Sequence, residues 1–88
     1  MPEQTQIEFK DFLKAIVVCA IKKFGKYKII EKRGSGIMVE LFRNEDDEKP
    51  FDMWVVHRDR CVWSKDLKKA YTKLRINKDE FLDIIYSR

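Results

Sequence analysis

The chain has 88 residues, of which 44% are hydrophobic and 39% charged, and its net charge at pH 7 is +4. This length fits one domain, residues 1–88, with a single apolar core, and it is too short for two. Two cysteines and one histidine exclude a disulfide-stapled fold and a structural zinc site, so we expect no metal and no cofactor. The positive charge is compatible with an anionic partner such as a nucleic acid.

The longest apolar run covers residues 15–21 and is bracketed by lysines. It is far shorter than the ~20 residues that a membrane-spanning helix needs. The first residues also lack the pattern of an export signal. We therefore expect a cytoplasmic protein with no membrane partner, in which Cys19 and Cys61 stay reduced.

The N-terminal part of the chain predicts one long helix. Thr5 and Glu8 have the spacing of a capping box, in which each side chain binds a free backbone amide at the helix start. Apolar residues then recur at helical spacing, and Gly25 is a typical helix stop. Val18 and Cys19 lie off this apolar stripe. Either neighbouring elements cover the helix on both flanks, or the pair is a self-association patch through which the chain forms a homodimer.

Three strands are predicted after this helix. β-branched and aromatic residues alternate with period two along three segments, residues 27–33, 37–43 and 51–57. Gly34 and Gly36 flank Ser35 between the first two segments, and they supply the backbone freedom that a tight hairpin turn needs. The three strands together predict an antiparallel meander.

One face of this sheet is a candidate binding surface. We expect Trp54 and Phe42 to stand on the open face. Their rings could stack on nucleic-acid bases, bind a protein partner, or simply pack under Trp63 or the acidic, solvated turn at residues 44–50.

The region after the sheet predicts two helices. Residues 61–63 could add a short extended piece. Ser64 is expected to cap the next helix, with Asp66 in its first turn, where a carboxylate complements the helix dipole. Asn77 is expected to cap the last helix together with Glu80. The order α-β-β-β-α-α predicts an α+β fold, a two-layer sandwich whose helices cover one face of a three-stranded antiparallel sheet.

Three local motifs lie after the first predicted helix. They are Lys32-Arg33-Gly34-Ser35-Gly36 at the hairpin turn, Val55-Val56-His57 at the end of the third strand, and Asn77-Lys78-Asp79-Glu80-Phe81-Leu82 at the last helix. They resemble the Gly-Ser-His, Pro-x-His and polar-x-x-Glu-Phe-Leu motifs of the HicA-type toxins, the YcfA-like family of toxin–antitoxin pairs. The resemblance implies a fold like the double-stranded-RNA-binding domain, cleavage of mRNA by an endonuclease, and a cognate antitoxin.

The chain departs from this family at several places: Val55 stands in place of the proline of the second motif, and the acidic loop and the first helix are longer. The departure at the hairpin turn matters most. The histidine of its Gly-Ser-His turn is the residue credited with RNA cleavage, and Gly36 stands at that place here. Glycine can neither accept nor donate a proton from a side chain. The family's catalytic assignment therefore does not carry over to this chain.

His57, the only histidine, is the remaining candidate catalytic residue. Metal-independent RNA cleavage needs a base for the 2′-hydroxyl and an acid for the leaving oxygen, and an imidazole suits both tasks near neutral pH. Asp59 or Tyr71 could assist it. The alternative is a strand-end histidine that packs or caps locally.

A basic set is the candidate RNA-binding surface, and it comprises Lys32, Arg33, Arg58, Arg60, Lys65, Lys68 and Lys69. The lysines at the helix start would add to the attraction of the helix amides for phosphate, although a solvated helix face has the same pattern. Our first hypothesis is a HicA-like RNA-binding toxin that could cleave mRNA. The second is a non-catalytic module that binds protein or nucleic acid through the open sheet face. The third is an accessory or viral protein that uses this fold for another role.

Overall fold

The computed structural model describes residues 3–34 and 36–87. Its elements, in chain order, are β1 (Gln4–Glu8), α1 (Phe9–Lys23), β2 (Lys26–Lys32), β3 (Gly36–Phe42), β4 (Asp52–His57), β5 (Cys61–Trp63), α2 (Ser64–Lys73) and α3 (Lys78–Tyr86). Strands β2, β3 and β4 form an antiparallel meander, and β1 pairs with β5 in a separate antiparallel sheet. The predicted α+β fold with a three-stranded antiparallel sheet is therefore confirmed.

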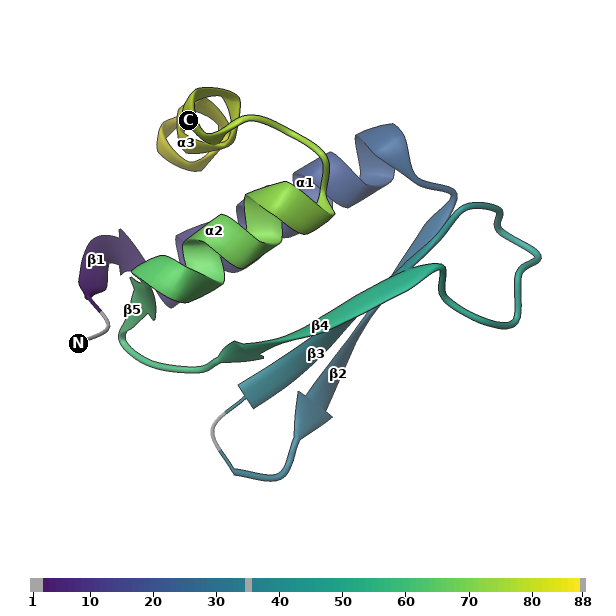
Figure 1. Ribbon diagram of the computed structural model, residues 1–88, viewed down its shortest axis with the longest axis horizontal. Helices are drawn as coiled ribbons and strands as arrows, with labels where there is room; N and C mark the ends of the chain where they lie inside the picture. Colours follow the sequence, from purple (N-terminus) through teal and green to yellow (C-terminus); the bar gives the residue numbers. More distant parts are fainter. Residues whose placement is uncertain (1–2, 35, 88) are drawn as a thin grey trace.

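The helices all lie on one side of the main sheet (Figure 1). Helices α1 and α2 are next to the strands, and α3 packs on them from the side that faces away from the sheet. The central strand β3 presents Ile37, Val39 and Leu41 to the helices, and all three are fully buried. Phe12 of α1 meets Phe81 of α3 edge to face, with ring centroids 5.9 Å apart. The core is thus continuous from the sheet through α1 to α3.

Residues 4–8 form a strand, so the capping box predicted at Thr5 and Glu8 is wrong. The Thr5 hydroxyl donates to the Val62 carbonyl of β5 at 2.7 Å. This pairing with a segment far along the chain replaces the local cap, and α1 begins only at Phe9. The short extended piece expected before α2 is confirmed as β5.

The expected position of Trp54 on the open sheet face is wrong. Trp54 is 4% exposed and lies opposite Val39, on the face that the helices cover. Phe42 does lie on the other face but is only 1% exposed. The Lys26 amino group is 4.5 Å from its ring centroid and donates to the Asp47 carbonyl in the acidic turn. Lys26 thus links the Phe42 ring to that turn, which matches the packing alternative and not an open stacking surface.

The two helix caps after the sheet have different outcomes. The Asn77 side chain accepts a hydrogen bond from the Glu80 amide at 2.7 Å, as predicted. Ser64 is not a cap, because it is the first residue of α2 and follows Trp63, which makes no side-chain cap. At the β2–β3 turn, Gly34 has φ 100°, a left-handed conformation that favours glycine. Ser35, expected at the centre of that turn, lies outside the described residues.

The burial of Val18 and Cys19 bears on the two alternatives for this pair, which are coverage of both helix flanks and a self-association patch. Cys19 is 2% exposed and Val18 is half-buried. Neighbouring elements therefore cover both flanks of the helix, and a homodimer stays a prediction. Cys19 and Cys61 form no disulfide. No helix in residues 3–34 and 36–87 is long and apolar enough to cross a membrane.

Candidate active site and basic surface

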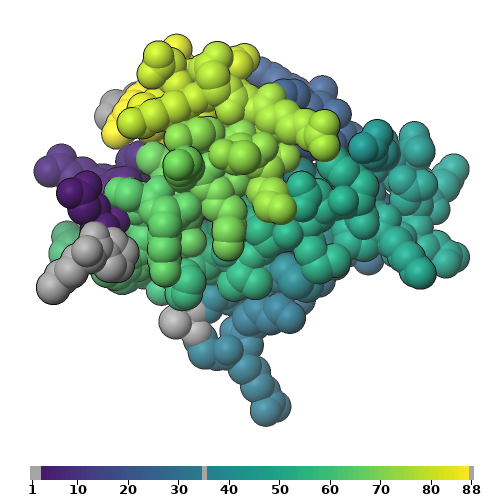
Figure 2. Space-filling view, in the orientation of Figure 1, coloured from purple at the N-terminus to yellow at the C-terminus, as the bar shows by residue number. Residues whose placement is uncertain are grey.

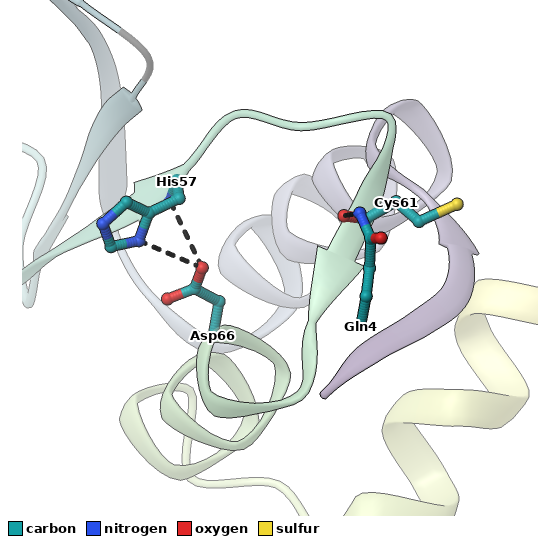
Figure 3. A network of polar contacts seen from close by, with 4 residues as sticks. All are labelled: Gln4, His57, Cys61 and Asp66. Atoms are coloured by element: carbon teal, nitrogen blue, oxygen red, sulfur yellow. Dashed lines mark hydrogen bonds and ion pairs between the residues drawn. The ribbon is translucent and has the colours of Figure 1, made fainter. Parts of the chain in front are cut away.

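His57 and Asp66 form the candidate active site (Figure 3). His57 is the last residue of β4, and Asp66 lies in the first turn of α2. His57 Nδ1 is 3.3 Å from Asp66 Oδ2, and the His57 backbone amide donates to the same oxygen, also at 3.3 Å. The Asp66 side chain is 3% exposed, whereas that of His57 is 54% exposed. A buried carboxylate therefore holds one edge of a ring whose other edge is open to solvent.

This geometry favours one tautomer of the His57 ring. An ionised carboxylate only accepts hydrogen bonds, so Nδ1 of His57 carries the proton in the contact with Asp66 and Nε2 keeps its lone pair. Serine hydrolases orient their catalytic base with the same pairing of carboxylate and imidazole. In this tautomer the free lone pair on His57 Nε2 can accept a proton.

The partner of His57 is Asp66, and neither Asp59 nor Tyr71 has this role among the described contacts. The Asp59 carboxylate instead accepts from the Arg60 amide at 2.7 Å. The sequence pattern assigned Asp66 only a favourable position near the helix dipole. Nothing local in the sequence indicates that the start of α2 returns to the end of β4, so this contact was missed.

Gly36 lies directly opposite His57 in the β3–β4 register, and its other neighbour, on β2, is Lys32. The three residues form one row across the end of the sheet. Because the middle residue is a glycine, no side chain stands between the lysine and the histidine. The structure thus brings the hairpin turn motif and the histidine together, although they were predicted separately.

Five of the predicted basic residues are near this end of the sheet. Lys65, Lys68 and Lys69 are exposed on α2, which crosses the middle of the face in Figure 2. Lys69 is one helical turn from Asp66 and therefore on the same side of α2. The other two residues, Lys32 and Arg33, are exposed at the end of β2 and in its turn.

The other two residues of the set, Arg58 and Arg60, lie in the segment between β4 and β5. Arg58 is exposed, but its guanidinium pairs with the Glu31 carboxylate at 3.0 Å. Arg60 is exposed just before β5, and its carbonyl accepts from the Phe9 amide at the start of α1. Arg58 is therefore close to β2, where Lys32 follows Glu31, whereas the Arg60 backbone is close to the start of α1.

The candidate active site is open to solvent at His57 and lies outside two hollows of the surface. A hollow of about 720 Å³ lies between α1 and α3, where it is lined by Lys14, Val18 and Ile84 among others, but it does not include His57. A second hollow, of about 250 Å³, is next to Phe51. An open site suits an extended polymer better than a small molecule, which is usually enclosed. Among the described residues, no group of three or more His, Cys, Asp or Glu side chains could hold a metal ion.

Comparisons of the chain with protein-family models, with curated proteins and with solved structures found no match. The resemblance to the HicA-type toxins therefore stays a prediction from local motifs. What the protein does must be inferred from the geometry around His57.

Proposed function

We propose that the protein binds RNA and cleaves it without a metal ion, in the manner of a HicA-like toxin, with His57 as the residue that transfers protons. The observation that carries this proposal is the contact between His57 Nδ1 and the buried Asp66 carboxylate at 3.3 Å. A carboxylate that orients a half-exposed imidazole beside a strip of open surface is the arrangement expected of a general base.

The proposed reaction is an internal transfer at one phosphodiester. Nε2 of His57 takes the proton of a ribose 2′-hydroxyl, and the 2′ oxygen attacks the adjacent phosphorus. The bond between phosphorus and the 5′ oxygen then breaks, and the departing oxygen takes the proton back from the imidazolium. The products are a 2′,3′-cyclic phosphate and a 5′-hydroxyl. One P–O bond forms, one breaks, and the proton passes from the 2′ oxygen to the 5′ oxygen, so no other reactant is needed.

The lysines of α2 would hold the RNA backbone next to His57. Lys65, Lys68 and Lys69 are exposed and have no carboxylate partner among the described ion pairs. Lys32 is on the other side of Gly36 and could neutralise charge at the reacting phosphate. In this proposal the protein partner is a cognate antitoxin, which the resemblance implies.

The test is an incubation of labelled RNA with purified protein in EDTA, beside His57→Ala and His57→Gln variants. Cleavage by the wild type that leaves 5′-hydroxyl ends and is lost in both variants supports the proposal. Cleavage that persists in the variants, or that needs an added metal, contradicts it. Binding should be measured in parallel at low and high salt, because phosphate contacts release counterions and weaken with salt.

A second candidate is a non-catalytic module that binds a protein through the open sheet face. This face carries a different apolar set from the one predicted, since Met53 is 47%, Val55 42% and Ile30 37% exposed. Ile30, Met38 and Val55 form one row across the three strands. A protein complex that is insensitive to salt and is lost in Val55→Lys, without any RNA cleavage, would favour this candidate.

A further inference from the structure

Three cationic side chains surround a pair of phenylalanine rings at the far end of the sheet from His57. The Phe24 and Phe51 ring centroids are 5.3 Å apart. The Arg43 and Arg75 guanidinium carbons lie 4.8 Å and 5.9 Å from the Phe51 centroid. Together with Lys23, these residues line the hollow of about 250 Å³. We refer to Lys23, Arg43 and Arg75, together with the Phe24 and Phe51 rings, as the Phe51 cluster.

The Phe51 cluster has three positive charges and no negative one. The lining of the hollow includes no Asp or Glu. None of Lys23, Arg43 and Arg75 takes part in an ion pair within residues 3–34 and 36–87. Arg43 and Arg75 pack on Phe51, and Lys23 is held beside them by a hydrogen bond to the Arg75 carbonyl. An anion in the hollow would relieve the repulsion among these three like charges.

Arg75 occupies a backbone position that favours glycine. Its φ is 59°, and it follows the last turn of α2 in a Schellman motif, in which its amide donates to the Thr72 carbonyl and the Ile76 amide donates to the Tyr71 carbonyl. Lys23 Nζ donates to the Arg75 carbonyl at 2.6 Å. The backbone of an arginine is strained at this φ, whereas that of a glycine is not. Any advantage of arginine over glycine here must therefore come from its side chain, which reaches Phe51.

We propose that the Phe51 cluster is a phosphate-binding site. Guanidinium groups match phosphate with two parallel hydrogen bonds, and a phosphate dianion neutralises three nearby cations better than a carboxylate does. The volume of the hollow is close to the lower limit for small-ligand sites, and it fits a phosphate with a small attached group. The phosphate could be free or a terminal monoester, or it could belong to the backbone of a nucleic acid.

This site is separate from the candidate active site. Phe51 directly precedes β4 and Arg75 follows α2, whereas His57 ends β4 and Asp66 begins α2. Phe51 and His57 are six residue steps apart, and at ~3.3 Å for each step the two sites are about 20 Å apart. The proposal therefore does not depend on RNA cleavage, and each can fail without the other.

The experiment is a titration of isotope-labelled protein with inorganic phosphate, followed by NMR at constant ionic strength. We expect saturable shifts of the Phe24, Phe51 and Arg75 signals. The Arg75→Gly variant should bind phosphate at least tenfold more weakly while its thermal midpoint does not fall, because glycine suits the backbone there. Arg43→Gln should also weaken binding, whereas Lys14→Gln, which removes the same charge from α1, should not.

Shifts that do not saturate, or that persist unchanged in Arg75→Gly, would overturn the proposal. Short RNA oligomers with and without a 5′-phosphate then identify the source of the phosphate. The same saturable shifts with both oligomers indicate backbone phosphate, and shifts only with the 5′-phosphorylated oligomer indicate a terminal monoester. Saturation by inorganic phosphate and by neither oligomer indicates the free ion.

Discussion

His57 and Asp66 are joined through one carboxylate oxygen, which accepts from both the ring Nδ1 and the backbone amide of the histidine at 3.3 Å. The contact attaches the start of α2 to the end of β4, so it has a structural role in any case. If the Asp66 carboxylate also orients His57 as a catalytic base, its charge should affect the rate of RNA cleavage and its shape should affect stability. The first prediction uses this difference.

Asp66→Asn keeps the size of the side chain but removes its charge. We expect RNA cleavage to slow by about 10²–10⁴-fold, the usual contribution of an oriented proton-transfer group, because Nδ1 no longer faces an anion. Single-turnover rates over a range of pH would measure this change, and RNA affinity should stay within about twofold. A purely structural Asp66 would instead lower the thermal midpoint and leave the cleavage rate of the folded fraction unchanged.

A second prediction concerns the glycine opposite His57. A Cβ at Gly36 would lie 3.1 Å from the Val56 carbonyl oxygen and 3.6 Å from Val55 Cγ1, so neighbouring atoms must move by a few tenths of an ångström. Gly36→His should therefore fold with a modest loss of stability. We expect it to cleave RNA about tenfold faster than the wild type, because it adds an imidazole to the row that contains Lys32 and His57.

Gly36→Ala is the matched control for this variant, since it introduces the same Cβ contact without the imidazole. Both variants should have similar thermal midpoints. If Gly36→His cleaves RNA no faster than Gly36→Ala, the row across the end of the sheet is not the site of cleavage.

Residue patterns predicted the sheet well because each of its features is local. Alternation identified the three strands, and the asparagine–glutamate spacing identified the cap at Asn77. The same alternation puts Trp54 and Val56 on one face of β4 and Met53 and Val55 on the other, as the structure has them. It did not identify the covered face, because Trp54 and Val56 on one side and Met53 and Val55 on the other are all apolar.

Contacts between distant segments could not be predicted in the same way. Thr5 and Glu8 satisfy a local capping rule, but pairing of residues 4–8 with β5 outweighs that rule. The link from Asp66 to His57 and the gathering of Arg43 and Arg75 on Phe51 depend on how α2 lies along β4. Such relationships follow from packing and have no signature in residue spacing.

A third prediction tests the basic surface of α2. Replacement of Lys65, Lys68 and Lys69 together by glutamine should weaken RNA binding at least tenfold. Three lost phosphate contacts should also reduce the slope of log affinity against log salt by about 2, since each contact with a single strand contributes about 0.7. Fluorescence anisotropy at several salt concentrations would measure both quantities.

The control for this variant is the triple change of Lys10, Lys14 and Lys22 to glutamine on α1, which alters the net charge equally. Equal losses of affinity and of salt slope in the two triple variants would mean that RNA binding depends only on net charge. That result would contradict a specific RNA-binding surface on α2.

A fourth prediction tests the N-terminal strand. Thr5→Val removes the hydroxyl that donates to the Val62 carbonyl and should lower the free energy of unfolding by about 1 kcal/mol. Thr5→Asp should be at least as destabilising, because a carboxylate cannot donate to a carbonyl. Asp is among the best helix N-caps, so an unchanged or higher stability in Thr5→Asp would instead support the capping box. Urea unfolding curves would distinguish the two outcomes.

The last prediction concerns the two thiols and pH. Burial raises the pKa of the Cys19 thiol above its ordinary value of 9.0, and the Glu80 carboxylate acts in the same direction, while Lys23 and Lys22 oppose it. The folded chain therefore keeps the Cys19 proton at a pH where the unfolded chain releases it. Folding stability should consequently be unaffected by this thiol below about pH 9 and should fall as the pH rises beyond it.

Alkylation followed by mass spectrometry would check this behaviour. Native protein treated with iodoacetamide should be modified at Cys61, which is half-buried, while Cys19, which is 2% exposed, reacts only after unfolding in urea. In Cys19→Ala the fall of stability above pH 9 should be shallower than in the wild type. Rapid labelling of Cys19 in the native protein would mean that the α1–α3 contact opens readily, and burial could then not be the cause of the raised pKa.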